Sequence, residues 1–126
     1  MKNKILNTSI LFFLFFTLNL FAQELEINSS KIKYDDINKV TILEGNVSSR
    51  DERGNKIFSE YAKYNKLIEL IETKGETKII TSAGYEVFGR DIIFDNRKNL
   101  IYSNNKTKIL DIDGNTVFVD MFNYSI

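Results

Sequence analysis

The chain has 126 residues, enough for one domain and too few for a second core. It carries 17 basic and 17 acidic residues, and setting aside Lys2 and Lys4 leaves 15 basic residues against 17, a balance that excludes the basic stripe needed to bind nucleic acid. Because there is no His and no Cys, imidazole bases, thiolate nucleophiles and ordinary zinc sites are excluded, and we expect no enzyme activity, no cofactor and no metal.

Residues 1–22 have the pattern of a secretory signal peptide. Lys2 and Lys4 provide the positive start, residues 10–16 form an almost continuous apolar run, and Ala22 is a small residue suited to cleavage. The alternative is a retained anchor helix, because residues 5–21 have about the minimum length that spans a bilayer. Either way, we expect residues 23–126 to form one exported domain, located in the periplasm.

A repeat of thirty residues organises the rest of the chain. The aromatic landmarks Tyr34, Tyr64, Phe94 and Tyr124 keep this interval, as do Gly54, Gly84 and Gly114. A second aromatic set follows the same period: Phe58, Phe88 and Phe118. Fixed self-similarity of this kind predicts a stack of one supersecondary unit, in which each copy buries its apolar face against its neighbours.

Each unit reads as strand, turn, strand, turn. Residues 40–47 are rich in β-branched and apolar types, a reversal follows at residues 51–55, and residues 56–64 return. Asp, Asn and Gly at 51–55 and at 111–115 suit tight hairpin turns, and Asp or Asn also follows each of the first three aromatic landmarks. Every second residue of 71–79 and of 101–109 is apolar or small, while those between are mostly polar, so these segments are expected to have one face inward.

Short segments recur in a fixed order along the repeat: Tyr34-Asp35, Ile42-Leu43-Glu44-Gly45-Asn46-Val47, Asp51, Gly54-Asn55, Ala62-Lys63-Tyr64-Asn65, Gly75-Glu76-Thr77, Gly84 to Asp91 and Asp113-Gly114-Asn115. In their order and spacing these segments resemble a known family, the OstA-like domain of bacterial lipopolysaccharide transport. The resemblance covers nearly all of residues 24–126, and no single motif carries it.

The resemblance implies an all-β fold, an open β-jellyroll or "β-taco" of stacked antiparallel hairpins, whose two sheets enclose an apolar groove. Such a groove holds the lipid A acyl chains of lipopolysaccharide, each buried methylene contributing about 0.8 kcal/mol. We expect the groove to be lined by apolar residues of successive units, and above all by Phe58, Phe88 and Phe118. The other expected lining residues are Ala62, Ile71, Ile79, Ile92, Ile101, Ile109 and Phe122.

The resemblance also implies partners. Unpaired strand edges at the end of a stack invite strand addition by other β-jellyroll transport proteins, and the predicted docking edge comprises Glu24, Leu25, Glu26, Ile27, Ile32 and Tyr34. The chain is most like the N-terminal domain of the large outer-membrane assembly protein, which would add an outer-membrane lipoprotein as partner and an outer-membrane association, and next most like the small periplasmic bridge protein.

Two other readings compete with lipid transport. A chain with the same period could wind into a structural β-solenoid or adhesin-like repeat with a filled core and no groove. Alternatively, the domain could be a glycan-processing enzyme that uses Asp35 or Asp91. Asp111 to Gly114 resembles the opening of a calcium loop, but position 122 is Phe where that loop requires a glutamate. The apolar inward columns and the export signal favour transport over these alternatives.

Overall fold

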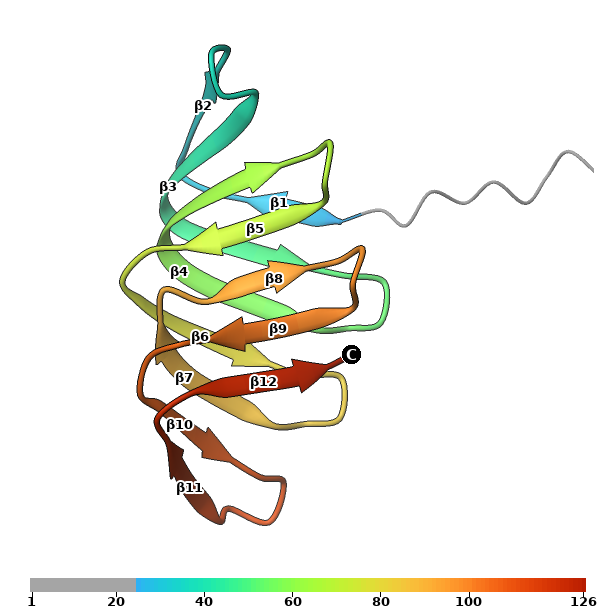
Figure 1. The fold of residues 1–126 in the computed structure, drawn as a ribbon, viewed down its shortest axis with the longest axis vertical. Coiled ribbons are helices and arrows are strands. Elements are labelled where there is room, and N and C mark those ends of the chain that lie inside the picture. The colour runs from blue at the N-terminus through green and yellow to red at the C-terminus, as the bar shows by residue number, and fades with distance from the viewer. Residues whose placement is uncertain (1–24) are drawn as a thin grey trace, which may run out of the picture.

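The computed structural model describes residues 25–126, and the predicted signal peptide lies outside them. Within these residues there are twelve strands and no helix, and every strand pairing is antiparallel, which confirms the all-β prediction. The strands form one sheet that folds back on itself into two facing layers, as in a β-taco (Figure 1). Residues 25–126 contain no helix with the length and apolarity needed to cross a membrane.

Two long strands belong to both layers and join them. These are β3 (Val40–Arg50) and β4 (Lys56–Asn65), which pair with each other on both sides of a bulge between Glu44 and Val47. Gly45 and Asn46 lie in the bulge with φ of 75° and 48°, a left-handed conformation that glycine adopts without strain and asparagine more easily than most residues. The bulge therefore redirects β3 from one layer into the other.

The remaining strands divide between the layers. The front layer continues from the first half of β3 and the second half of β4, and it contains β2 (Lys31–Asp35), β5 (Leu70–Thr73), β8 (Ile93–Asp95), β9 (Leu100–Ser103) and β12 (Phe122–Ser125). The back layer contains β1 (Glu26–Asn28), β6 (Glu76–Ile80), β7 (Glu86–Arg90), β10 (Thr107–Leu110) and β11 (Thr116–Val119).

The chain crosses between the layers along one side of the molecule, which we call the seam. β5 leads to β6, β7 to β8, β9 to β10 and β11 to β12 on this side, at the left of Figure 1, whereas the hairpin turns that follow β3, β4, β6, β8 and β10 lie at the right. The sequence predicted one strand across residues 71–79 and another across 101–109, and this was wrong. Each is two short strands in opposite layers, because the chain turns at Gly75 and at residues 104–106.

The predicted reversals are confirmed. Residues 51–55 and 111–115 form hairpin turns, and residues 36–39, 66–69 and 96–99 form the other set. The turns keep the thirty-residue period in their backbone, since Lys39, Glu69 and Asn99 have φ of 56°, 51° and 54°. The repeat seen in the sequence is thus a repeat of conformation.

Candidate functional site

The inner face of each layer carries a row of side chains that runs across the strands from end to end. The front inner row is defined by strand register as Tyr34, Thr41, Tyr64, Ile71, Phe94, Ile101 and Tyr124. The back inner row is Ile27, Ser49, Ile57, Ile79, Val87, Ile109 and Val117. These two rows are where an apolar ligand between the layers would lie.

Seven of the ten predicted groove residues face this interior. Six of them are buried and one, Ile109, is partly buried against the others: Ala62, Ile71, Ile79, Ile92, Ile101, Phe122 and Ile109. The structure therefore brings together the aliphatic residues of successive units. The prediction that every second residue of 71–79 and 101–109 faces inward holds for the apolar and threonine positions, even though each segment is split between layers.

The three phenylalanines expected foremost in the groove lie elsewhere. Phe58, Phe88 and Phe118 are exposed on the outer face of the back layer, so this part of the prediction was wrong. The inward positions in β4 are 57 and 59 before the crossing and 62 and 64 after it, so the parity of inward residues changes where the strand passes from one layer to the other. The prediction assumed that Phe58 and Ala62, four residues apart in one strand, point to the same face, and the change of layer makes this false.

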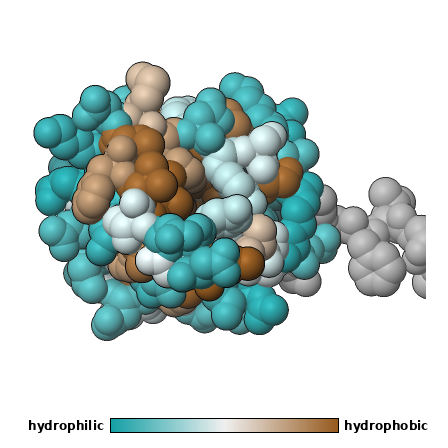
Figure 2. Space-filling model, turned by 90° about the horizontal axis from the view of Figure 1, so that it is seen from below, coloured by the Kyte–Doolittle hydropathy of each residue, from teal (hydrophilic) through white to brown (hydrophobic). Residues whose placement is uncertain are grey.

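The inner rows are closed in the middle and uncovered at the ends. Ile79, Ile101 and Ala62 are 0% exposed, so no space separates the layers at the central units. At the N-terminal end Ile32 and Tyr34 are 59% and 62% exposed, and at the C-terminal end Val117 is 54% exposed. Figure 2, seen from the C-terminal end, shows apolar side chains gathered within a polar rim.

Small hydroxyl residues line the seam and satisfy the backbone there. The Thr77 hydroxyl lies 2.7 Å from that of Thr73, whose oxygen accepts a hydrogen bond from the Ile92 N–H at 2.9 Å. In the next unit the Ser103 hydroxyl donates to the Arg90 carbonyl at 2.8 Å. These bonds fix the crossings, because a buried polar group that lacked a partner would destabilise the fold. Among the described side chains, the Ser49 hydroxyl is buried without such a partner.

Three titratable groups are shifted by their surroundings. The pKa of Tyr64 in the front inner row is raised, first because partial burial disfavours the phenolate and then because Glu69 is nearby. The pKa of Asp35 is lowered by the side-chain amide of Asn38 and then by its backbone N–H, and that of Asp111 is lowered in the same way by Asn115. Both carboxylates act within their own turns, where their oxygens accept hydrogen bonds of 2.7–3.0 Å.

The predicted docking residues occupy two edges instead of one. Leu25, Glu26 and Ile27 lie at or in β1, which pairs with β3 at the edge of the back layer, while Ile32 and Tyr34 lie in β2 at the edge of the front layer. Glu24 falls outside the described residues. At the other end of the stack, β11 and β12 are the corresponding edges, so each end presents one edge per layer.

The sequence analysis missed several inner residues. Leu43, Val47, Ile57, Val87 and Phe94 are all buried in the core but were not among the predicted lining residues. A usable signal existed for Ile57 and Val87, which recur with Val117 at the thirty-residue interval, and for Phe94, which is one of the aromatic landmarks.

The described residues hold no group of three or more acidic side chains arranged to bind a metal ion. A scan of the sequence against models of known protein families and a search of curated proteins found no match.

Proposed function

We propose that this chain is a lipid-conveying module of the OstA-like kind, located in the periplasm, that carries the acyl chains of lipopolysaccharide between its two layers. The observation that supports this most directly is the pair of inner rows, which extend across all units and are uncovered at both ends. A stack with apolar inner faces and open ends suits a ligand that enters at one end and passes to a neighbour at the other.

Loading would begin at the C-terminal end. There Val117 is largely exposed, Ile109 pairs with it, and Phe122 and Tyr124 lie in the terminal strand of the front layer, so acyl chains would meet an apolar surface without first separating the layers. Deeper entry requires the layers to part, because the central residues are fully buried. Each methylene that replaces water at this surface contributes about 0.8 kcal/mol.

Photocrosslinking tests this proposal. A photoreactive amino acid at Val117 or Ile109 should label purified lipopolysaccharide, and the same probe at the exposed Lys74 should not. Lipopolysaccharide stripped of its acyl chains should give no label at any position. Labelling from Lys74 but from neither inner position would contradict the proposal.

The docking of neighbours is the second part of the proposal. The front layer ends in β2 at one end and β12 at the other, so pairing β2 of one module with the terminal strand of another β-jellyroll protein would continue the inner row. The chain has no cysteine, so Tyr34→Cys and Tyr124→Cys report only on introduced pairs. If copies of this chain stack in this way, mixing the two variants should give a mixed disulfide that neither forms alone; its absence would leave other transport proteins, including an outer-membrane lipoprotein, to be tested as the partner.

One observation favours a second candidate, a structural repeat without a lipid groove. The layers are in contact through side chains that are 0–2% exposed across the central units, as expected for a filled β-solenoid. On that reading lipopolysaccharide would neither label Val117 nor change the thermal unfolding midpoint. A midpoint that rises with lipid concentration would instead support conveyance.

A further inference from the structure

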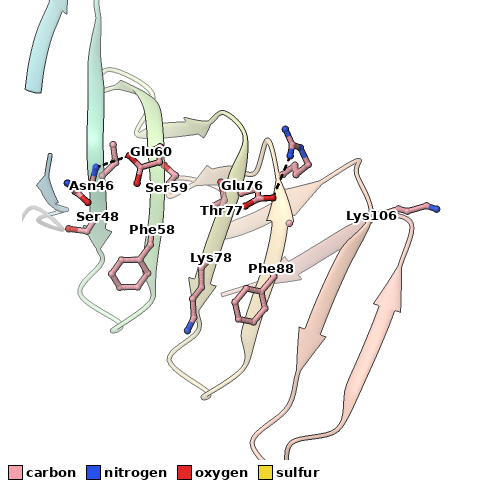
Figure 3. Close-up of a pocket in the computed structure, with 13 residues that line it drawn as sticks. Asn46, Ser48, Phe58, Ser59, Glu60, Glu76, Thr77, Lys78, Phe88 and Lys106 are labelled. Carbon is pink, nitrogen blue, oxygen red and sulfur yellow. Dashed lines mark hydrogen bonds and ion pairs between the residues drawn. The ribbon is translucent and has the colours of Figure 1, made fainter. Parts of the chain in front are cut away.

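The outer face of the back layer carries an alternating row of phenylalanine and lysine. Strand register places one residue from each of five strands in a line, in the order Phe58, Lys78, Phe88, Lys108 and Phe118. Figure 3 shows Phe58, Lys78 and Phe88 projecting from neighbouring strands on the same side. Because adjacent strands are about 4.8 Å apart, successive phenylalanines in this row are roughly 10 Å apart.

The lysines of the row lie against the central ring. The ammonium groups of Lys78 and Lys108 are 5.2 Å and 5.7 Å from the centre of the Phe88 ring, within the range of a cation–π contact. Lys78 also pairs with Glu86 at 3.0 Å. Lys108 forms no ion pair with any carboxylate of residues 25–126, so its charge is available to an anionic ligand.

The row borders a line of grooves, which we call the trough. A groove of about 860 Å³ lies between Phe58 and Phe88, a second of about 450 Å³ lies between Phe88 and Phe118, and a third of about 260 Å³ adjoins Phe58. Since neighbouring grooves share a phenylalanine, they follow one another along the row. Phe58 and Phe88 are 39% and 37% exposed, so part of each side chain packs against its neighbours and part is open to the grooves.

The trough is more basic than the chain as a whole, whose net charge is zero. Six basic side chains line it, against four acidic ones: Arg50, Lys56, Lys78, Arg90, Lys106 and Lys108 against Glu26, Glu60, Glu76 and Asp120. Two of the basic side chains are already paired, Arg90 with Glu76 at 3.9 Å and Lys78 with Glu86 at 3.0 Å, so the surplus depends on the other four, Lys108 among them. The surplus favours an anionic ligand that lies along the row.

We propose that this trough binds an acidic polysaccharide, whose carboxylates draw Lys78 and Lys108 away from the Phe88 ring and whose sugar rings then stack on the phenylalanines. An aromatic ring offers a flat apolar face to the C–H bonds of a sugar ring, and its quadrupole attracts their partial positive charge. The repeating interval suits a polymer with repeating units of similar length. This site lies on the opposite side of the back layer from the inner rows, so it is independent of lipid conveyance.

Two other occupants suit the trough less well. A planar bilayer surface would reach Phe118, which is 77% exposed, more readily than Phe58 and Phe88, which are 39% and 37% exposed. Single-stranded nucleic acid also stacks its bases on aromatic rings, but it needs a positively charged groove along its backbone, and four acidic side chains lie among the basic ones here.

The test is calorimetric titration of the full chain with two acidic polysaccharides, alginate and polygalacturonate. We expect at least one to bind, and we expect Phe88→Ala and Lys108→Gln each to weaken that binding about tenfold, since each removes one stacking or ionic contact. Phe88→Leu keeps the apolar volume but loses the ring, so it should weaken binding nearly as much. The matched controls are Tyr85→Ala, at a turn residue as exposed as Phe88, and Lys66→Gln, in a turn of the front layer; neither should change the affinity.

Neutral dextran, anionic phosphatidylglycerol vesicles and oligothymidylate are titrated in parallel, and circular dichroism checks that each variant is folded. The proposal is overturned if neither acidic polysaccharide binds, if the Phe88 and Lys108 variants bind as the unmodified chain does, or if vesicles or oligothymidylate bind as tightly as the polysaccharide. Binding of the acidic polymers but not of dextran, with loss in Phe88→Leu, supports it.

Discussion

Copies of the same repeat position behave differently in the middle and at the ends of the stack. Val87 in a central unit is 1% exposed, whereas Val117, thirty residues later, is 54% exposed. The two residues are identical and occupy equivalent strands, β7 and β11, so the difference comes from what lies beside them. β7 is covered on both sides, by β6 and β10, while β11 pairs with β10 alone. Neighbouring units, more than local sequence, therefore decide whether an inner residue is core or surface.

The largest expected effect compares two phenylalanines. Phe94 is 1% exposed in the front inner row, and Phe118 is 77% exposed on the outer face. Phe94→Ala should lower the free energy of unfolding by about 3–5 kcal/mol, because it leaves a cavity in the core, while Phe118→Ala should change it by less than about 0.5 kcal/mol. Urea unfolding of both variants measures the difference, and equal losses would mean that the two rings are similarly packed.

A smaller effect is expected for the two valines. Val87→Ala should destabilise the fold by about 2 kcal/mol, since two buried methyl groups are lost, and Val117→Ala by less than about 1 kcal/mol. If a partner or second copy covers the C-terminal end, the cost of Val117→Ala should rise with protein concentration. Repeating the urea titration over a hundredfold range of concentration tests this point.

The turns give a third comparison. Asn55 is buried, bonds to Asp51 through its backbone and side chain, and accepts the Ser82 N–H of the next unit at 2.8 Å. Asn115 makes the same bonds to Asp111, but no next-unit donor reaches it within residues 25–126. Asn55→Ala should therefore cost about 1–3 kcal/mol and Asn115→Ala about 1 kcal/mol or less. Similar thermal unfolding midpoints for the two variants would show that the contact between units contributes little.

The smallest expected effect is a loss of stability at alkaline pH. The pKa of Tyr64 is raised in the folded protein, so its contribution to stability is fully present below the usual tyrosine value of about 10 and is lost as pH rises through the raised value. As pH rises above about 10, the free energy of unfolding of Tyr64→Phe should therefore fall less than that of the unmodified chain. Urea midpoints measured across the alkaline range check the sign, and parallel curves would refute it.

Part of this architecture was predictable from the sequence. The repeat at Tyr34, Tyr64, Phe94 and Tyr124 predicts the stacking of units, and the Asp, Asn and Gly clusters predict the turns, because both depend on local chemistry. The inward position of Ile71, Ile79 and Ile101 followed from alternation within short segments.

The layer crossings could not be predicted in the same way. Alternation holds only while a strand stays in one layer, and the residues at which the chain crosses carry few marks beyond Gly45 and Gly75. In the next unit Asn105 stands where Gly75 does, and Asp91, with φ of 51°, lies at the crossing from β7 to β8, which has no glycine. The outward row at Phe58, Phe88 and Phe118 was therefore placed on the wrong side of the sheet. Nor could the exposure of the inner rows be predicted, because it depends on which strands lie on either side of a residue and not on the residue's own segment.

The two long strands also make the molecule mechanically asymmetric. At the N-terminal end, β3 and β4 carry the backbone hydrogen-bond ladder through both layers. Farther along, the backbone joins the layers through the short seam crossings alone, beside the packing of inner side chains. Separating the two layers should therefore be hardest next to β3 and easiest at β11 and β12. Any gaping of the layers would then widen progressively toward the C-terminus, which gives the stack a direction although its units are alike.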